Sequence, residues 1–426
     1  MIRILQYGEV PKEQIFARRG SAPDVEGVVA EIIAEVVKNG DAALRAYTKK
    51  FDKAELDALE VSEAEFEEAL AAVEPAFLEV LREAADNIRA YHEKQLRRDY
   101  VMMEREGVVL GMKITPIEKV GLYVPNGTAP YPSTVLMDSI PAKIAGCREL
   151  VMVTPPSSDG KCNPFILAAA RVAGVDRVFK VGGAQAIAAL AYGTESIPAV
   201  YKIVGPGNAY VAEAKKQVYG KVAIDVVAGP SEVLAVADES CDPRIVAADL
   251  LSQAEHDVLS TAALVTDSRT FAEKVALEIE RQLPLLPRCE IARASIENNG
   301  MILVAEDLDQ AIEIANELAP EHLELCMDEP FAWLDRVKNA GSIFLGKNAP
   351  EALGDYMAGP NHTLPTGGIA KFASPLGVDD FVKKSQFTYY TREALSKIAD
   401  KIALFARGEE LEGHARSVLS RFEDSI

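Results

Sequence analysis

The spacing of apolar residues changes along the chain, and the changes predict where helices give way to sheets. Residues 24–49 place apolar side chains at helical intervals on one face. Ser62 and Glu65 have the spacing of a capping box, which predicts the start of a second helix. Pro75 suits the first turn of a third helix that runs to about Gln95. The first hundred residues are therefore predicted to be mainly helical.

From Ile117 onward, short apolar runs alternate with helical stretches, which predicts mainly parallel sheets covered by helices. The runs fall into two groups, so we expect two α/β domains. The predicted strands are Val120–Val124, Leu150–Thr154, Val178–Val181, Lys202–Val204 and Ala223–Val227, followed by Val233–Ala237, Ala262–Thr266, Met301–Ala305 and Ser342–Leu345. The predicted helices between them are Asn163–Ala173, Ala184–Ala191, Ala209–Val218 and Pro243–His256.

The pattern becomes helical again from Thr391. An apolar stripe near the end of the chain must pack on its own domain or on a neighbouring subunit; it consists of Ala415, Val418, Leu419 and Phe422. The sequence thus predicts the α/β class, with helical extensions at both ends. The expected parts are a helical region (1–116), a first α/β domain (117–230), a second α/β domain (231–385) and a helical tail (386–426).

Composition excludes several classes of protein. The formal net charge of −20 argues against binding to nucleic acid and disfavours an anionic membrane surface. The chain contains no apolar run of about 18 residues, and its first ten residues do not resemble a secretory signal. Five scattered cysteines without C-x-x-C spacing argue against a disulfide framework and against a thiolate zinc site. We therefore expect a cytoplasmic protein.

Histidine is rare, with five in the chain, so the position of each one is informative. His92 lies beside Glu93 and Lys94 in a charged helix, and we expect it to be an exposed surface residue. The other four, His256, His322, His362 and His414, lie in more distinctive surroundings.

Gln253 and His256 end a predicted helix and project from one face of it, because they are three residues apart. An imidazole nitrogen suits zinc, and an amide oxygen can serve as a harder ligand. The pair is therefore a candidate for metal binding. The alternative is that His256 only interacts favourably with the dipole at the end of the helix.

Glu321 and His322 follow Pro320, which makes a bend in the chain plausible. A bend would let these neighbours share one pocket, although neighbouring residues diverge on a regular helix or strand. A carboxylate beside an imidazole provides two bases for removing a proton and activating water. The alternative is a pair of exposed loop residues.

Residues 354–368 contain so much glycine and proline that we expect a loop, and its polar side chains are unusual for a connector. Asp355 is a natural third metal ligand, and His362 is a candidate for binding substrate or metal. Glu409 and His414 lie in the helical tail, where a solvated helix face is the alternative.

Gly205-Pro206-Gly207-Asn208 follows a predicted strand and opens a helix, which is the setting of a phosphate-binding loop. Tyr210 stands where a G-x-G-x-x-G fingerprint has its third glycine. Three further loops follow or precede predicted strands, where open α/β sheets bind ligands, although each alone could be a simple turn. They are Tyr123–Gly127, Gly182–Gln185 and Gly229–Glu232.

Together these motifs resemble the histidinol dehydrogenase family in order and approximate spacing. The segments that carry the resemblance are Val120–Thr134, Gly182–Ala189, Gly205–Lys215, Gly229–Leu234, Leu250–His256, Ala319–Leu323 and Gly354–Gly368. The family fold is similar to two incomplete Rossmann-like α/β domains with helical extensions. The resemblance therefore accounts for the missing glycine fingerprint.

The resemblance implies a role for each candidate residue. Gln253, His256 and Asp355 match zinc ligands, and the fourth ligand is His414 of the partner subunit in a homodimer with one Zn²⁺ per subunit. Glu321 and His322 match the acid–base pair. Positions that match or neighbour substrate contacts are Ser231, Gln253, His256, His322, Asp355, His362, Glu409 and His414. Positions that match NAD⁺ contacts are Tyr123, Gln185 and Asn208.

The implied activity is the last step of histidine biosynthesis. L-Histidinol is oxidised through L-histidinal to L-histidine with two NAD⁺ and one water, zinc anchors the substrate, His322 is the general base, and Glu321 activates the water. Two competing interpretations use the same residues. A zinc hydrolase would share the donors and the Glu base without needing NAD⁺, and a non-catalytic protein could bind a small molecule between two α/β domains.

Overall fold

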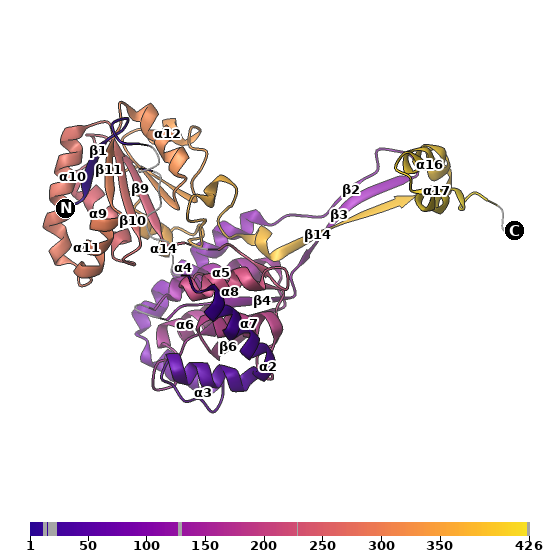
Figure 1. The fold of residues 1–426 in the computed structure, drawn as a ribbon, viewed down its shortest axis with the longest axis horizontal. Coiled ribbons are helices and arrows are strands. Elements are labelled where there is room, and N and C mark those ends of the chain that lie inside the picture. The colour runs from indigo at the N-terminus through magenta and orange to yellow at the C-terminus, as the bar shows by residue number, and fades with distance from the viewer. Residues whose placement is uncertain (12–14, 16–23, 127–129, 228, 424–426) are drawn as a thin grey trace. The chain divides into compact units, whose positions relative to one another are not determined.

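The computed structural model describes residues 1–11, 15, 24–126, 130–227 and 229–423 (Figure 1). The chain forms two compact units. The first contains Met1–Gln95 and Ile117–Phe381, and the second contains Leu96–Pro116 and Val382–Ile426.

Among the described residues, three helices precede the first sheet, as the apolar spacing predicts. They are α2 (Glu26–Phe51), α3 (Glu63–Ala72) and α4 (Pro75–His92), and a short 3₁₀ turn, η1 (Glu93–Gln95), follows. The Ser62 side chain accepts a hydrogen bond from the Glu65 N–H while the Glu65 carboxylate accepts one from the Ser62 N–H, so the predicted capping box is confirmed. The helices pack on the sheet's own helices through the pairs α2–α7, α3–α6 and α4–α5.

The first sheet has five parallel strands in the order β6-β5-β4-β7-β8. The strands are β4 (Lys119–Tyr123), β5 (Glu149–Thr154), β6 (Arg177–Lys180), β7 (Lys202–Val204) and β8 (Ala223–Ile224). The helices α5 (Pro132–Ala145), α6 (Pro164–Ala173), α7 (Gly183–Tyr192) and α8 (Ala209–Val218) connect them or follow them. Separate apolar clusters cover the two faces of the sheet. The strand order reverses between β4 and β7, which is where such sheets bind ligands.

The second sheet has six parallel strands in the order β1-β11-β10-β9-β12-β13, of which β1, β9, β10 and β11 are labelled in Figure 1. They are β1 (Arg3–Gln6), β9 (Glu232–Ala237), β10 (Thr261–Thr266), β11 (Met301–Val304), β12 (His322–Cys326) and β13 (Ser342–Leu345). The covering elements are α9 (Pro243–Ala254), α10 (Arg269–Gln282), η2 (Leu283–Leu285), α11 (Cys289–Asn298), α12 (Leu308–Leu318), α13 (Phe331–Leu334) and α14 (Glu351–Tyr356). Without the edge strand β1, this order is the same as in the first sheet. Parallel sheets covered by helices confirm the predicted α/β class.

The first unit ends with two short turns, η3 (Ile369–Lys371) and η4 (Val378–Phe381). The second unit is an antiparallel sheet, β14-β3-β2, followed by three helices. Its elements are β2 (Tyr100–Met102), β3 (Val108–Pro116), β14 (Val382–Tyr390), α15 (Arg392–Ser396), α16 (Ala399–Gly408) and α17 (Glu412–Leu419). From the apolar stripe, Ala415 and Leu419 pack against Ala403 and Ala406 of the same unit. Part of the stripe therefore packs within its own chain.

Two expectations from the sequence are wrong. His92 is 0% exposed, because it continues the buried face of α4 that carries Leu81 and Ile88, and its Nδ1 lies 2.8 Å from the Ile88 carbonyl oxygen. Residues 354–356, expected in a loop, form the last turn of α14. The strands β1, β2, β3, β12 and β14 were not predicted.

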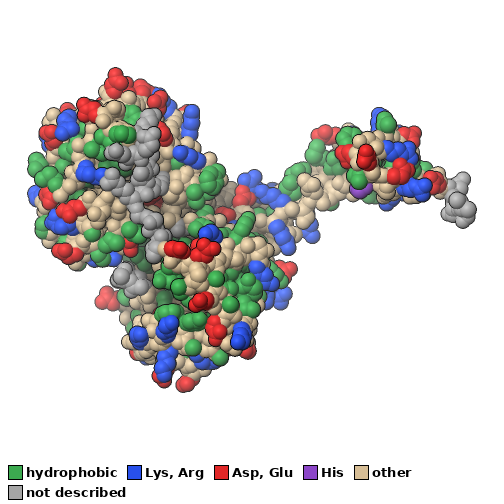
Figure 2. All heavy atoms as spheres, in the orientation of Figure 1, with side chains coloured by type: hydrophobic (Ala, Val, Ile, Leu, Met, Phe, Trp, Pro, Cys, Tyr) green, Lys and Arg blue, Asp and Glu red, His purple; other side chains and the backbone are tan. Residues whose placement is uncertain are grey.

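No helix in the described ranges is long and apolar enough to cross a membrane. On the face seen in Figure 2, acidic and basic side chains are interspersed.

Candidate active site

The end of α9 carries an unsatisfied amide in the protein interior. Gln253 is 0% exposed, and neither its Nε2 nor its Oε1 has a hydrogen-bond partner among the described residues. Leaving such a group unpaired is costly, so its position calls for a ligand. His256 follows two residues after the helix, and its N–H donates to the Gln253 carbonyl oxygen at 3.2 Å.

Two carboxylates on α14 join His256. One ligand atom from each of His256, Glu351 and Asp355 lies within 4.8 Å of the other two. Glu351 and Asp355 are four residues apart, so one helical face carries both. The structure therefore places the predicted ligands His256 and Asp355 together. It adds Glu351, which the sequence analysis missed although the four-residue spacing was visible.

The charges in this cluster are strongly coupled. Burial opposes ionisation of Asp355, but a hydrogen bond from His362 and the nearby imidazoles hold the pKa of this carboxyl below its usual value. Burial also opposes protonation of His362, and its contact with Asp355 nevertheless raises the pKa of the imidazole. Burial, followed by the charge of Asp355, raises the pKa of Glu351 to about 8. A group of nitrogen and oxygen donors with excess negative charge suits a divalent cation.

The backbone of one residue, Glu232, holds both members of the predicted acid–base pair. Helix α12 ends at Leu318, Ala319 follows it in the left-handed conformation, and His322 begins β12. The Glu321 Oε2 accepts from the Glu232 N–H at 2.8 Å, while the His322 Nδ1 lies 2.9 Å from the Glu232 carbonyl oxygen. Because a carbonyl oxygen can only accept, the Nδ1 carries the hydrogen in this contact. The His322 Nε2 is buried and has no partner within the described part of the chain, so it is free to accept a proton.

The two side chains are 5% and 4% exposed, so the interpretation as an exposed loop pair is wrong. Burial lowers the pKa of His322 to about 4, which leaves the imidazole neutral at pH 7. Burial raises the pKa of Glu321 well above its ordinary value, and the charges of Glu351 and Asp355 raise it further. A hydrogen bond with the Ser231 side chain acts in the opposite direction. Ser231 directly precedes β9, and its side chain is hydrogen-bonded to Glu321.

The loop after α14 is pinned to α5 of the first sheet. The His362 Nε2 lies 3.3 Å from the Thr134 Oγ1, and the Thr363 hydroxyl donates to Asp138 at 2.8 Å. The Asn361 side chain donates to the Met137 carbonyl oxygen at 2.7 Å. These contacts fix His362 beside Asp355, where the Nδ1–Oδ1 distance is 3.5 Å.

The candidate NAD⁺ contacts follow three strands of the first sheet. Tyr123 ends β4, and its hydroxyl accepts from the Gly183 N–H at 3.1 Å, two residues before Gln185. Asn208 caps α8 by accepting from two N–H groups of its first turn. Gly205 follows β7 with a φ of +115°, and a Cβ there would lie 2.2 Å from the Tyr123 carbonyl oxygen.

These residues therefore border the point where the strand order reverses, the expected place for a nucleotide. Gly127, at the end of the predicted Tyr123–Gly127 loop, lies outside the described residues, as do Thr128 and Ala129 of the Val120–Thr134 segment.

Glu409 and His414 belong to the second unit. Glu409 caps the C-terminal end of α16, His414 lies in α17, and both side chains are exposed. Their predicted part in the site stays a prediction.

Comparison with known proteins identifies the family of this chain. The family model described as histidinol dehydrogenase matches residues 17–422. A histidinol dehydrogenase from Clostridium acetobutylicum is 51% identical, with 99% of each chain covered, and one from Bacillus cereus is 56% identical over 94% of this chain and 93% of its own. The crystal structure of histidinol dehydrogenase from Elizabethkingia anophelis matches with a TM-score of 0.94 and 38% identity, covering 99% of this chain and 98% of its own. The chain therefore belongs to the histidinol dehydrogenase family of oxidoreductases.

Proposed function

We propose that this chain oxidises L-histidinol through L-histidinal to L-histidine, using two NAD⁺ and one water, as the last step of histidine biosynthesis. One observation carries the proposal: the His322 Nε2 and the Gln253 amide are both buried without a hydrogen-bond partner in the described part of the chain. The site thus contains a free base and a free metal donor. Neither group has a partner among the described residues that would explain its burial.

The donor set fits a zinc ion. Gln253, His256 and Asp355 would hold it from this chain, and His414 of the partner subunit is the proposed fourth ligand. A bound Zn²⁺ would supply a Lewis acid that anchors nitrogen donors of the substrate and has no accessible redox chemistry, so the electrons must go to the nicotinamide. Glu351 adds a carboxylate within the same cluster.

His322 is the proposed general base for both oxidations. In the first, the Nε2 takes the hydroxyl proton while the carbon-bound hydrogen leaves as hydride to NAD⁺. The Nδ1–H bond to the Glu232 carbonyl oxygen then stabilises the imidazolium. Because the pKa of His322 is held at about 4, the proton is readily passed on and the base is regenerated.

Glu321 is the proposed base for the water that adds to the aldehyde. The Glu232 N–H and the Ser231 side chain orient its carboxyl group. Its raised pKa suits a group that takes a proton from water. His322 then acts again on the hydrate as the second hydride leaves. Both bases lie next to each other, so the aldehyde need not leave the site between the two steps.

The remaining predicted contacts complete the proposal. Tyr123, Gln185 and Asn208 would bind NAD⁺ at the carboxyl edge of the first sheet. Ser231, His362, Glu409 and His414 would contact the substrate, the last two as part of a cytoplasmic homodimer. His362 is fixed beside Asp355, which is a suitable position for a substrate contact.

The proposed activity is tested by the yield of NADH from a limiting amount of L-histidinol. We expect two NADH per histidinol and L-histidine as the product. A zinc hydrolase or a non-catalytic binding protein would form no NADH. Release of free aldehyde with one NADH per histidinol would contradict the roles given to Glu321 and His322.

The shared site is tested by mixing two inactive variants, His322→Asn and His414→Ala, under conditions that allow subunits to exchange. If His414 acts across subunits, one of the two sites in each mixed dimer contains both native residues, so activity returns. If His414 acts within its own chain, every site lacks one residue and the mixture stays inactive.

A further inference from the structure

One face of β12 carries three polar or sulfur-containing side chains, and the proposed reaction uses only the first. His322, Glu324 and Cys326 alternate with Leu323 and Leu325, which belong to an apolar cluster. Parallel strands buried on both faces are normally apolar throughout. Glu324 is nevertheless 1% exposed, and no Lys, Arg or His side chain pairs with it in the described part of the chain. This buried carboxylate therefore needs an explanation.

A second carboxylate, from Asp249 of helix α9, lies close to Glu324 and Cys326. Asp249 lies one helical turn before Gln253, and its carboxylate accepts no hydrogen bond from any described residue. Ligand atoms of Asp249, Glu324 and Cys326 all lie within 4.8 Å of one another. The cluster is separate from the donors at His256, Glu351 and Asp355, although the Glu351 N–H donates to the Glu324 Oε1 at 2.8 Å.

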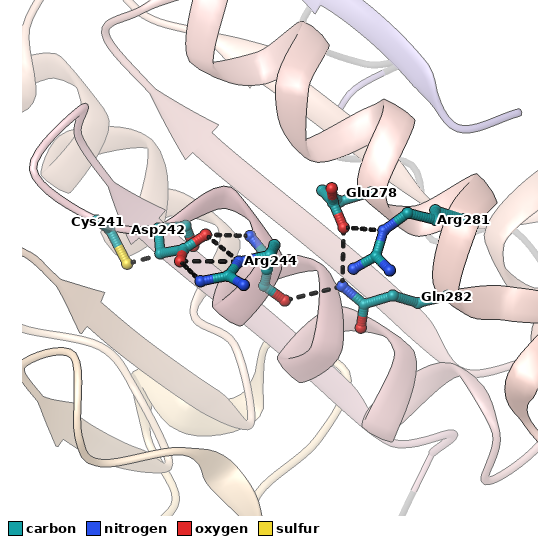
Figure 3. A network of polar contacts seen from close by, with 6 residues as sticks. All are labelled: Cys241, Asp242, Arg244, Glu278, Arg281 and Gln282. Carbon is teal, nitrogen blue, oxygen red and sulfur yellow. Dashed lines mark hydrogen bonds and ion pairs between the residues drawn. The ribbon is translucent and has the colours of Figure 1, made fainter.

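A second thiol, from Cys241, lies beside Cys326 of this cluster. The Cys326 thiol forms a hydrogen bond with the Cys241 sulfur, and these two side chains are 3% and 4% exposed. Figure 3 shows Cys241 in the segment that enters α9, with its sulfur directed toward Asp242. Two thiols from different segments thus meet without C-x-x-C spacing.

The location also favours a ligand. Cys326 pairs with Ala237 in the register of β12 and β9, so it lies at the carboxyl ends of two neighbouring strands. The strand order reverses between these strands, as it does between β4 and β7 in the first sheet. In open α/β sheets this point is the usual place for binding. Asp249 is only half-buried, which leaves a route for an ion from solvent.

We propose that Cys241, Asp249, Glu324 and Cys326 form a second cation site for a thiophilic divalent ion such as Zn²⁺. Two thiolates and two carboxylates are ligands that zinc accepts in tetrahedral sites. Binding would displace the thiol protons to solvent. The ion would link the segment before α9, the helix itself and β12. Its ligands Asp249 and Glu324 lie on the same helix and strand as Gln253 and His322. This proposal reverses the expectation of no thiolate zinc site, which considered only spacing along the sequence.

The electrostatics agree with the geometry. Burial raises the pKa of Asp249 to about 6 and that of Glu324 well above its usual value, so both carboxyl groups lack a compensating charge. The hydrogen bond from Cys326 lowers the pKa of Cys241, and the Lys347 ammonium group lowers it further. Cys241 is therefore the thiol that ionises first. A bound cation would compensate the charge of all four groups.

The test uses Cd²⁺, added to the reduced, zinc-loaded protein, because cadmium bound to thiolate absorbs in the ultraviolet. The donors Gln253, His256, Glu351 and Asp355 contain no sulfur, so exchange at the candidate active site gives no such band. We expect a thiolate band that saturates at one Cd²⁺ per chain. A wild-type protein without this band overturns the proposal, and it does so without reference to the proposed dehydrogenase activity.

Matched variants locate the site. Cys241→Ser and Cys326→Ser should each lose the band, whereas Cys289→Ser, which changes a half-exposed cysteine at the start of α11, should retain it. Circular dichroism checks that the serine variants are folded. A band that survives in both folded variants, or that disappears in Cys289→Ser, contradicts the assignment.

Discussion

The two parallel sheets of the first unit share one strand order but place their candidate chemistry at opposite edges. In the first sheet, Tyr123 and Gly205 lie at the carboxyl ends of β4 and β7. In the second sheet, Ser231 and His322 lie at the amino ends of β9 and β12. The strands concerned are the equivalent pair in both sheets, next to the reversal of strand order. The strand order alone therefore does not determine at which edge of a sheet the candidate site residues lie.

The two edges also differ in the kind of group that would contact a ligand. At the edge of the first sheet, the conformation of the backbone shapes the candidate binding loop. Gly205 has a positive φ and packs against the Tyr123 carbonyl group, and Asn208 caps a helix. The second sheet offers buried ionisable side chains whose pKa values are shifted in opposite directions, as in His322 and Glu321. We therefore expect substitutions in the first sheet to change nucleotide affinity, and substitutions in the second to change proton transfer or metal content.

The largest effect is expected for His322→Asn. Removal of a general base lowers kcat by about 10²–10⁴-fold. The amide retains a donor for the Glu232 carbonyl oxygen, so the fold and the zinc content should persist. Steady-state kinetics and elemental analysis of the same preparation measure both quantities. If zinc is lost and the remaining holoenzyme turns over normally, His322 is a ligand instead of the base.

His256→Ala should show the reverse order of losses. This variant removes a donor from the cluster with Glu351 and Asp355. Metal affinity should fall by more than the roughly 10–100-fold that follows loss of a group outside the ligand set. Zinc content after dialysis should drop first, and activity should return in part at high added zinc. A variant that keeps its zinc through dialysis contradicts the assignment.

Gly205→Ala tests the first sheet, and Gly220→Ala is its matched control. Both glycines have positive φ, +115° and +98°, so each alanine carries backbone strain of order 1–3 kcal/mol. At Gly205 the new Cβ would lie 2.2 Å from the Tyr123 carbonyl oxygen, whereas no atom of the described residues lies within 4 Å of a Cβ at Gly220. We expect the KM for NAD⁺ to rise in Gly205→Ala alone, while kcat changes less. Equal effects in both variants would show that strain, and not the shape of the loop, is responsible.

The smallest effect concerns the contact that pins the second-sheet loop to α5. Burial raises the pKa of Asp138 to about 7 from an ordinary value of 3.8. Between these values the folded protein binds more protons than the unfolded chain, so this group makes the free energy of unfolding fall as pH rises. Asp138→Asn removes that contribution while an amide oxygen can still accept from Thr363. Denaturant titrations at pH 4 to 7 should give a flatter dependence in the variant, and an unchanged slope would contradict the burial of an ionisable group.

Prediction from the sequence succeeded where apolar spacing was regular. The bounds predicted for Lys202–Val204 and Ser342–Leu345 match β7 and β13, because these are compact apolar runs between clear helical patterns. It failed at β12, whose residues His322 to Cys326 alternate polar and apolar side chains although both faces are buried. The polar side chains of that strand belong to the candidate sites. They interrupt the continuous apolar run that is typical of a buried parallel strand.

The sequence could predict which residues belong to the candidate site, but it could not predict the contacts that hold them together. Rare histidines in unusual settings, and the resemblance to a family, pointed to Gln253, His256, His322 and Asp355. No local pattern could indicate that the Glu232 backbone holds both Glu321 and His322, because that contact joins residues about ninety positions apart. His92 was placed wrongly for the same reason, since the segment that covers it includes Asn361, far along the chain.

The central claim is that Gln253, His256 and Asp355 hold a metal ion beside the Glu321–His322 pair. The most direct measurement is anomalous scattering at the zinc edge from crystals grown with L-histidinol. The account predicts a peak at about 2.0–2.2 Å from nitrogen and oxygen donors of these three side chains, with the substrate alcohol facing the His322 Nε2. A zinc-loaded, active crystal with no peak between these side chains, or with the alcohol directed away from His322, would contradict it.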